Sequence, residues 1–375
     1  MTTRRKFLSK SLKAASAAGL APLLPIFNAS AMHLPQKEGL EAFPKGRANG
    51  NGLVLPNNHG LGGVAIGNAF RPTTDEQAQE ALEGAWDAGV RFFDTSPYYG
   101  LGLSERRFGR FLHNKEREDY VLATKVGRIL KASKDAPDSI WKEPAPFGYD
   151  YDFSASGVRR SVEDSLQRMG VDRIDIVFIH DLSPENEELG DWTEYFKKAE
   201  KGAMPELIKM REEGIIKGWG FGVNRIDPIL RAIEVSDPDI CLTATRYSLI
   251  EHEEALNRLF PVCEQNQVTL ISGAPLNSGF LAGIDRYNYS EEIPAGFKEK
   301  RERLSQIAEK HGTDLRTAAL QFCAAPSIMA AVIPGTRYAS QAKENVESMK
   351  VKIPSDFWQE LKEENLIAEN APVPL

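Results

Sequence analysis

The sequence predicts an α/β fold, a (β/α)8 TIM barrel of parallel strands, and two observations support it. Short apolar runs alternate eight times with amphipathic stretches of helical period, all within about 290 residues. Several of these runs are almost continuously apolar, which is typical of parallel strands that are buried on both faces. A doubly wound open sheet is the competing fold. It is disfavoured because no GxGxxG motif follows a predicted strand and opens a helix.

The expected strands and helices follow one another in a regular order. The strands are expected at residues 61–67, 90–96, 120–126, 175–181, 217–223, 240–246, 269–275 and 329–335. The helices are expected at residues 74–90, 156–170, 204–215, 228–235, 254–265, 314–324 and 340–349. In the first helix Ala78, Leu82 and Ala85 lie on one apolar stripe, and Thr74 or Asp75 is the expected N-cap.

Three long polar segments interrupt this alternation. Residues 128–153, 182–203 and 282–298 follow the third, fourth and seventh predicted strands. All three therefore lie at the carboxyl ends of strands, which is where a barrel of this kind builds its active site.

Composition and charge exclude several classes of protein. The chain has 375 residues, of which 42% are hydrophobic and 26% charged, as in an ordinary globular protein. Its net charge of −7 argues against a nucleic-acid partner, because phosphate recognition needs a basic face. Three cysteines are too few for a disulfide framework, and Cys241, Cys263 and Cys323 are expected to pack as buried apolar groups. No metal site is expected, because the acids after His180 lack the spacing of a metal cage.

The N-terminal residues have the features of an export signal. Arg4 and Arg5 precede Lys6-Phe7-Leu8, as in a twin-arginine signal, and a small-x-small cleavage pattern ends at Ala31. We therefore expect a signal peptide at 1–31, a tether at 32–52 and the barrel at 53–375, in a periplasmic or otherwise exported protein. The apolar run of this signal is shorter than the roughly twenty residues of a membrane-spanning helix, so no membrane anchor is expected. The twin-arginine pair makes the twin-arginine translocase the expected partner during export. The alternative is a basic tail with a chance arginine pair.

Four polar residues lie at or just after the ends of consecutive predicted strands. Asp94 and Tyr99 follow the second strand, Lys125 ends the third and His180 ends the fourth. A lysine beside a tyrosine is expected to lower the pKa of the phenol, which then exchanges a proton more easily. Asp94 is expected to hold Lys125, and a neutral His180 to bind the reacting oxygen. Taken singly, each residue also has an ordinary structural explanation, but the four together favour a catalytic site.

Five motifs, in order, resemble those of the aldo-keto reductase family. They are FDTSPYYG (93–100), SERRFGRFL (104–112), LATKVGR (122–128), SLQRMGVDRIDIVFIHD (165–181) and GFGVN (220–224). The resemblance extends over about residues 53–350. Within the family, the stretches at 100–110, 124–130, 244–252 and 274–283 are most similar to the branch of aldose 1-dehydrogenases and pyridoxal 4-dehydrogenase.

The resemblance implies an NAD(P)-dependent oxidoreductase that moves a hydride between nicotinamide and a carbon of a sugar or small aldehyde. Tyr99 would be the general acid/base, Lys125 its pKa modulator, Asp94 the partner of Lys125, and His180 the group that orients the substrate oxygen. Trp141 and Trp192, in the long polar segments, are candidates for stacking on a sugar ring, and packing within the loops is an equal alternative.

The resemblance also implies cofactor-binding positions in three segments. They are Asn224 for the carboxamide, Ala274, Pro275, Leu276 and Ser278 for the pyrophosphate, and Gly335, Thr336, Arg337, Gln341, Glu344 and Asn345 for the adenosine. Either NADP or NAD is expected. Arg337, which could bind a phosphate with two hydrogen bonds, and the export signal favour NADP.

The chain departs from the family pattern at four places in or beside these segments, one of which is Gly335 in place of a common lysine. Gly273 stands where many members stack a tyrosine on the nicotinamide, and Ala244 stands where many have a glutamine, which leaves Arg246 to hold the carboxamide. Gln341 replaces a common basic residue for the 2′-phosphate of NADP.

Two other functions compete with an oxidoreductase. A non-catalytic nucleotide-sensing or interaction subunit would not need the intact set of Asp94, Tyr99, Lys125 and His180. A barrel glycoside hydrolase would need two carboxylates about 5–10 Å apart at the mouth. Only Asp94 qualifies, and Lys125 is expected to occupy it.

Overall fold

Eight parallel strands form the central sheet of the computed structural model, which describes residues 53–134, 137 and 139–374. In sheet order they are β1 (Leu61–Gly62), β2 (Phe92–Asp94), β3 (Val121–Val126), β6 (Ile176–His180), β7 (Gly218–Val223), β8 (Ile240–Ala244), β9 (Thr269–Gly273) and β10 (Met329–Ile333). Parallel bridges from His59 to Val332 and from Gly62 to Gly335 bring the last strand back to the first. The sheet is therefore a nearly closed barrel, and the predicted (β/α)8 fold is confirmed.

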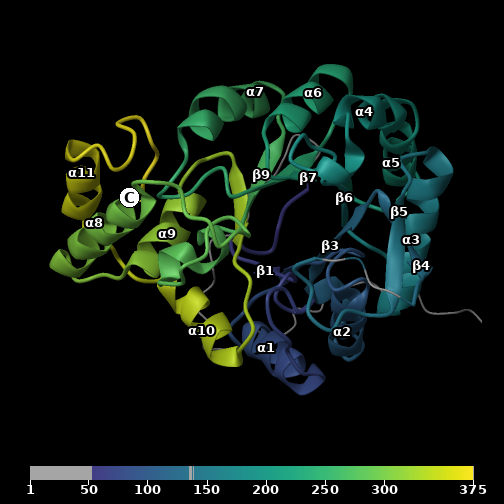
Figure 1. Ribbon diagram of the computed structural model, residues 1–375, viewed down its shortest axis with the longest axis horizontal. Helices are drawn as coiled ribbons and strands as arrows, with labels where there is room; N and C mark the ends of the chain where they lie inside the picture. The colour runs from purple at the N-terminus through teal and green to yellow at the C-terminus, as the bar shows by residue number, and fades with distance from the viewer. Residues whose placement is uncertain (1–52, 135–136, 138, 375) are drawn as a thin grey trace, which may run out of the picture. The chain divides into compact units, whose positions relative to one another are not determined.

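Helices surround the strands (Figure 1). They are α1 (Asp75–Asp87), α2 (Leu103–Leu112), α3 (Ala155–Met169), α4 (Trp192–Lys201), α5 (Ala203–Glu212), α6 (Asp227–Val235), α7 (Phe260–Gln265), α8 (Phe297–Lys310), α9 (Leu315–Ala324), α10 (Ala339–Ser348) and α11 (Ser355–Glu363). Each predicted helix is present, although the one expected at 254–265 consists of a π-helical turn at Ala255–Leu259 followed by α7. Four helices, α2, α4, α8 and α11, were not predicted.

The local sequence explains where the helices begin and end. Thr74 caps α1 with a reciprocal pair of hydrogen bonds to Gln77, so Thr74 rather than Asp75 is the N-cap. Ser154 caps α3, which ends at Gly170 with φ 65°, a left-handed conformation that glycine adopts without strain. The unpredicted α4 begins after Asp191, whose carboxylate accepts from the Thr193 N–H. Half of the polar segment 182–203 is thus helix.

Side chains from alternate strand positions fill two separate layers of core. Phe92, Phe178 and Ile271 belong to the layer enclosed by the barrel, whereas Phe93 and Val177 pack under the helices. Every residue of β2 and β6 is buried, as the continuous apolar runs predicted.

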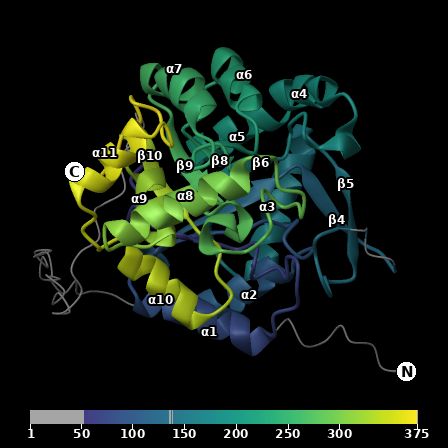
Figure 2. The same ribbon diagram turned by 60° about the vertical axis from the view of Figure 1, so that its left-hand side comes forward.

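The polar segment after β3 contains structure that the sequence did not predict. Residues 128–153 include an antiparallel hairpin of β4 (Arg128–Ala132) and β5 (Phe147–Tyr151). The hairpin stands beside α3 at the edge of the barrel (Figure 2). It carries Arg128, Tyr149 and Tyr151 to the carboxyl ends of the strands.

The expected roles of the cysteines are confirmed, because Cys241, Cys263 and Cys323 are all free and buried. Among the described residues, no helix is both long and apolar enough to span a membrane. The predicted signal at 1–31 and tether at 32–52 lie outside the described residues.

Candidate active site

The four residues predicted to carry the chemistry converge at the carboxyl end of the barrel. Asp94 ends β2, Lys125 lies in β3 and His180 ends β6, while Tyr99 is in the turn that follows β2. All four are buried, with Lys125 only 1% exposed. Parallel pairing of β3 with β2 on one side and β6 on the other brings their ends to the same place.

Lys125 and Asp94 form a buried ion pair. Nζ of Lys125 donates to both carboxylate oxygens of Asp94, at 2.8 and 2.7 Å, and to the carbonyl oxygen of Thr95 at 2.9 Å. Burial lowers the pKa of Lys125 and raises the pKa of Asp94, and the attraction between the two charges opposes both shifts. All three ammonium protons are therefore used, and Lys125 is held rigidly.

Tyr99 lies against this pair, but its pKa moves in the direction opposite to the prediction. Nζ of Lys125 is 4.6 Å from the centre of the Tyr99 ring. Burial raises the pKa of Tyr99 well above 10, and the negative charge of Asp94 raises it further. The expected net lowering of this pKa is therefore not seen, because burial and the charge of Asp94 outweigh the neighbouring positive charge. Tyr99 is a protonated phenol.

His180 is neutral, as the sequence predicted. Burial lowers its pKa to about 3. Its Nδ1 is 3.2 Å from Oγ of Ser96, and its ring lies edge-on to the Tyr99 ring, with 5.7 Å between the ring centres. A neutral imidazole beside a phenol can bind a substrate oxygen without adding a charge.

Sequence reasoning missed Arg128, which is buried beside His180. Its guanidinium group lies 4.1, 5.0 and 5.4 Å from the ring centres of Tyr98, Tyr151 and Tyr149. It also donates to Oδ2 of Asp181 at 2.9 Å and lies 3.4 Å from Nδ1 of His180. The signal was its place three residues after Lys125, followed by tyrosines at alternate positions in 147–151.

Asp181 is the other residue that sequence reasoning passed over. It has φ 47°, a left-handed conformation that is uncommon outside glycine and concentrates at functional sites. This conformation brings Oδ1 of Asp181 to 3.5 Å from Nε2 of His180. Its side chain is 26% exposed, so a carboxylate faces the mouth of the barrel.

Of the two candidate tryptophans, Trp141 lies at the site and Trp192 does not. The Trp141 ring lies 5.6 Å from the Tyr99 ring and 5.3 Å from the Tyr98 ring, so it forms a wall of the site. Trp192 is in α4 and packs against Phe196 instead. On the same side, the hydroxyl groups of Tyr149 and Tyr151 both donate to Glu188, which ties the hairpin to the loop after β6.

The residues of the expected carboxamide site make contacts within the protein. Arg246 donates to the carbonyl oxygen of Asn224 and, at 2.7 Å, to Oε1 of Glu185. Arg246 is therefore engaged with other groups of the protein. Next to Ala244, Thr245 has φ 67°, and its buried hydroxyl group has no hydrogen-bond partner among the described residues.

The segment expected to line the pyrophosphate is a strained turn after β9. Ala274 and Ser278 have φ of 47° and 60°, Pro275 is buried and Leu276 is half-buried. The carbonyl oxygen of Ser278 accepts two hydrogen bonds from Arg286, at 3.1 and 2.9 Å. A cation thus stands beside this turn, and the strain is consistent with a binding site.

In the adenosine segment, Arg337 binds groups of the protein. Arg337 donates to the carbonyl oxygens of Ala69 and Arg71, both at 2.8 Å, and to the hydroxyl group of Thr73. Its guanidinium group holds the loop after β1, and these contacts do not distinguish NADP from NAD.

The remaining residues of the adenosine segment have assorted environments. Gly335 is exposed, Thr336 and Asn345 are buried, Gln341 accepts from the Arg337 N–H and Glu344 pairs with Arg316.

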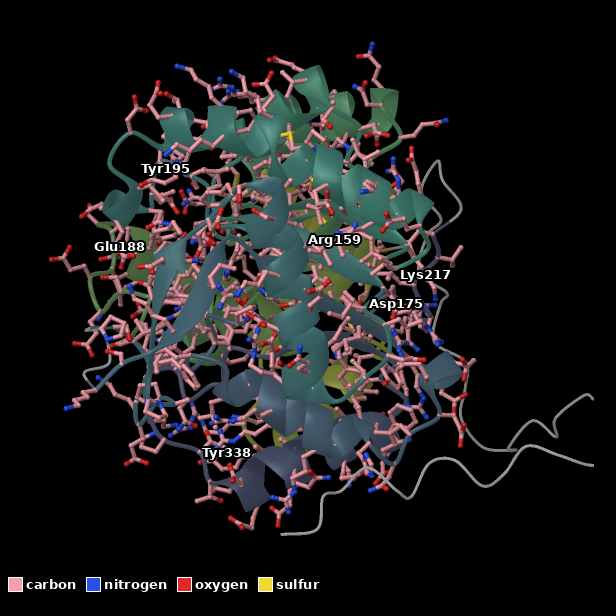
Figure 3. All side chains as sticks on the ribbon, turned by 90° about the vertical axis from the view of Figure 1, so that its right-hand side faces the viewer. Arg159, Asp175, Glu188, Tyr195, Lys217 and Tyr338 are labelled. Atoms are coloured by element: carbon pink, nitrogen blue, oxygen red, sulfur yellow. The ribbon has the colours of Figure 1, made fainter. Side chains whose placement is uncertain are left out.

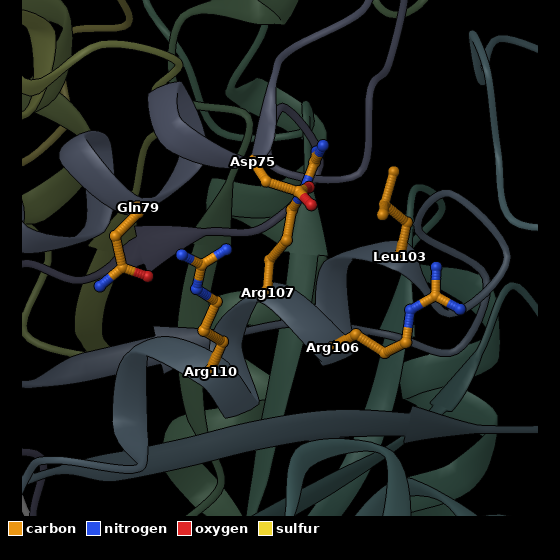
Figure 4. Close-up of a pocket in the computed structure, with 6 residues that line it drawn as sticks. All are labelled: Asp75, Gln79, Leu103, Arg106, Arg107 and Arg110. Carbon is orange, nitrogen blue, oxygen red and sulfur yellow. The ribbon is translucent and has the colours of Figure 1, made fainter.

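A cavity of about 200 Å³ lies between α1 and α2, away from the four converging residues. Figure 4 shows its lining, namely Asp75, Gln79, Leu103, Arg106, Arg107 and Arg110. Within it the buried Arg107 donates to Asp75 at 2.8 Å, to the carbonyl oxygen of Ile66 at 2.6 Å and to that of Thr73 at 2.7 Å. Arg107 and Arg337 together anchor the loop after β1.

The geometry of Asp94 excludes the competing glycoside hydrolase function. Both oxygens of Asp94 bind Lys125, so Asp94 cannot serve as one of two free carboxylates in a glycoside hydrolase. Among the described residues, no group of three or more His, Cys, Asp or Glu side chains could hold a metal ion.

Comparisons with known proteins agree with this geometry. Residues 59–365 match the model of the Aldo/keto reductase family. The chain is 35% identical over 327 residues to D-threo-aldose 1-dehydrogenase of a Pseudomonas species, which covers 84% of this chain and 96% of that protein. It is 33% identical over 326 residues to pyridoxal 4-dehydrogenase of Microbacterium luteolum, which covers 82% of this chain and 94% of that protein.

Solved structures show the same fold. An aldo-keto reductase from Bacillus halodurans in its holo form superposes with a TM-score of 0.65 at 21% identity, over 88% of this chain and 98% of that chain. The chain belongs to the Aldo/keto reductase family and is a nicotinamide-dependent oxidoreductase.

Proposed function

We propose that this protein transfers a hydride between a nicotinamide cofactor and the carbonyl or hydroxyl carbon of a sugar or small aldehyde, with Tyr99 exchanging the proton. The observation that carries the proposal is the burial of the Tyr99 phenol between His180 and the Lys125–Asp94 ion pair. A non-catalytic subunit would have no need to keep a lysine and an aspartate buried together at the mouth of the barrel.

In the reductive direction, Tyr99 acts as a general acid. Its raised pKa keeps the phenol protonated, so it donates its proton to the substrate oxygen as negative charge develops there. Neutral His180 orients the same oxygen by a hydrogen bond. Lys125, held by Asp94, stabilises the phenolate that remains after the transfer.

In the oxidative direction, Tyr99 must first lose its proton, so oxidation is expected to accelerate as the pH rises. The cost of that ionisation in a buried site makes reduction the easier direction near neutral pH. With an aldose whose anomeric carbon reacts, the oxidised product would be a lactone.

The residues present fit a nicotinamide cofactor. The buried hydroxyl group of Thr245 and the side chain of Asn224 would hold its carboxamide, since Thr245 has no protein partner among the described residues. The strained turn at 274–278, with Arg286 beside it, would hold the pyrophosphate. When bound, the cofactor supplies or accepts the hydride.

A polyhydroxylated substrate fits the walls of the site. Trp141 and Tyr98 offer aromatic faces on which a sugar ring can stack, and the partly exposed carboxylate of Asp181 can accept from its hydroxyl groups. The similarity to D-threo-aldose 1-dehydrogenase and pyridoxal 4-dehydrogenase supports an aldose or an aromatic aldehyde as substrate.

We also propose that the protein is exported by the twin-arginine route and keeps its cofactor bound. Free nicotinamide cofactor is scarce outside the cytoplasm, so a resident cofactor would be recycled by oxidation of one substrate and reduction of another. The absorbance of the purified, signal-processed protein tests this. A reduced-nicotinamide band that an aldehyde bleaches would support retention, whereas loss of cofactor on dialysis would contradict it.

The test of the main proposal is the Tyr99→Phe variant. We expect it to bind both NAD and NADP as the wild type does but to lose roughly 10²- to 10⁴-fold in kcat for aldoses and pyridoxal. The far-ultraviolet circular dichroism and the thermal midpoint control for folding. Full turnover in the variant would rule out Tyr99 as the acid/base, and no turnover of any aldehyde by the wild type would favour the non-catalytic subunit.

A further inference from the structure

Arg128 occupies an unusual position beside the candidate active site. It is 5% exposed and sits among three tyrosine rings, although its charge would be solvated at lower cost on the surface. Burial alone would lower its pKa, but the adjacent Asp181 raises the pKa above its ordinary value, so the group is a permanent cation. Neither the sequence motifs nor the proposed proton transfer gives Arg128 a role.

The hydrogen bonds around His180 determine which of its nitrogens carries the proton. Arg128 can only donate, and its Nη1 faces Nδ1 of His180 at 3.4 Å. Oγ of Ser96, which accepts from the backbone N–H of Tyr98 at 3.1 Å, lies 3.2 Å from Nδ1 and can donate its own proton there. Because a guanidinium group cannot accept a hydrogen bond, its contact with Nδ1 makes Nδ1 the acceptor and places the proton of a neutral His180 on Nε2.

Asp181 lies between the guanidinium group and the imidazole. Oδ2 accepts from Arg128 at 2.9 Å, and Oδ1 is 3.5 Å from Nε2 of His180. Without Arg128, this carboxylate would face His180 with no other cation of the described residues forming an ion pair with it, and a carboxylate at this distance favours imidazolium. An imidazolium would carry a charge into the step that Tyr99 is proposed to perform.

We propose that Arg128 is a positioning residue that holds His180 as the neutral Nε2–H tautomer and prevents Asp181 from forming an ion pair with a protonated His180. This inference rests on the proposed oxidoreductase function, in which Nε2–H donates to the substrate oxygen. The tyrosine rings keep the guanidinium group in place by cation–π contact, and their link to Glu188 fixes the hairpin that carries it.

The charged and titratable groups that face His180 come from four elements. Asp181 follows His180 in the chain, Arg128 comes from β4, Lys125 from β3, and Tyr98 and Tyr99 from the turn after β2. Lys125 already has Asp94 as its partner. Asp181 is therefore the group that favours a charged His180, and Arg128 is the group that offsets it.

Histidine side-chain ¹⁵N NMR of the full-length protein tests the assignment directly. The sequence has six histidines, and His180→Gln identifies the resonances of His180. In the wild type we expect a protonated Nε2 and an unprotonated Nδ1 across neutral and mildly acidic pH. In Arg128→Met we expect the pKa of His180 to rise by about two units, because Asp181 then acts on it unopposed.

Two further variants keep the test decisive if Arg128→Met is poorly folded. Arg128→Lys retains the cation and should leave the titration of His180 low. The double variant Arg128→Met/Asp181→Asn removes both opposing charges and should return the titration of His180 to within about half a unit of the wild type. If the titration in Arg128→Met equals that of the wild type, or if Nδ1 carries the proton in the wild type, the proposal is wrong.

Arg117 offers a matched control at the opposite end of the barrel. It is a partly buried arginine whose side chain is 11% exposed, and it donates to the fully buried Asp175 at 2.5 Å. Figure 3 shows Asp175 and Lys217 on one side of the molecule and Glu188 on the other. Arg117→Met should destabilise the protein without changing the titration or tautomer of His180.

The kinetic readout separates this inference from the proposed function. In Arg128→Met the pH profile of kcat/KM should gain an acidic limb at the new pKa of His180, and Arg128→Lys should lack it. If the wild type turned over no carbonyl substrate, the proposed function would fail, while the NMR result would still decide what Arg128 does to His180.

Discussion

At the scale of single residues, the Lys125–Asp94 pair affects both the stability of the fold and the proposed catalysis. Both side chains are fully buried and each satisfies the other, so removal of one leaves an unpaired charge in the core. Removing one member of such a pair costs about 3–5 kcal/mol, whereas replacing both by neutral groups costs much less. The catalytic rate is expected to behave differently, because the proposed phenolate of Tyr99 is stabilised by the positive charge of Lys125, which the double replacement also removes.

Lys125→Met should therefore lower both the free energy of unfolding, by about 3–5 kcal/mol, and kcat. In the double variant Asp94→Asn/Lys125→Met most of the stability should return, but kcat should stay low. Urea unfolding and steady-state kinetics on the same preparations measure the two effects. Recovery of kcat together with stability would show that the pair has only a structural role.

At the scale of elements, Arg337 joins the loop after β1 to the loop after β10. Its guanidinium group donates to carbonyl oxygens of residues 69 and 71, and Arg107 holds the same loop from α2. This arrangement follows from the closure of the barrel, which brings the first and last strands together. A residue expected to recognise a phosphate thus links two segments of the mouth.

Arg337→Gln accordingly should weaken NAD and NADP binding by similar factors and lower the thermal midpoint by several degrees. Cofactor titration by quenching of protein fluorescence gives the two dissociation constants. A selective loss of NADP affinity would mean that Arg337 contacts the 2′-phosphate after all, and would reinstate the prediction made from the sequence.

At the scale of the whole molecule, buried histidines make the fold sensitive to acid. Burial lowers the pKa of His59 and His252 to about 4 and that of His180 to about 3. Unfolded histidine titrates near 6.5, so below that pH the unfolded chain binds protons that the folded chain does not. Their neutral forms contribute stability that is complete above pH about 6.5 and is lost as the pH falls towards 4.

The thermal midpoint should therefore drop steeply between about pH 6.5 and pH 4, since each pKa unit corresponds to about 1.4 kcal/mol. His252→Gln should flatten that drop while also lowering the midpoint at neutral pH. His252 accepts at 2.9 Å from the N–H of Ala368 and lies 3.0 Å from the carbonyl oxygen of Ser248. A midpoint that is constant across this range would contradict the assignment of neutral buried histidines.

Much of the fold was predictable from the sequence, and the missed parts share a cause. All the predicted strands and helices are present because apolar periodicity reports local burial. The β4–β5 hairpin and α4 were expected to be polar loops, because their outward faces carry charges such as Lys131, Asp150 and Glu194. Their inward aromatic faces, including Tyr149 and Tyr151, have meaning only against the partners that the fold supplies.

The sequence by itself determined the barrel and the identity of the four residues at its mouth. The succession of apolar runs along the chain, and the polar residues at their ends, can be read directly from the sequence. Only the tertiary structure decided the ionisation of Tyr99, the partners of Arg337 and the place of Arg128 beside His180. These depend on burial and on contacts between segments far apart in the chain. The spacing of strand ends predicted the Lys125–Asp94 pair, but it did not show that Arg128 and Asp181 lie within a few ångströms of His180.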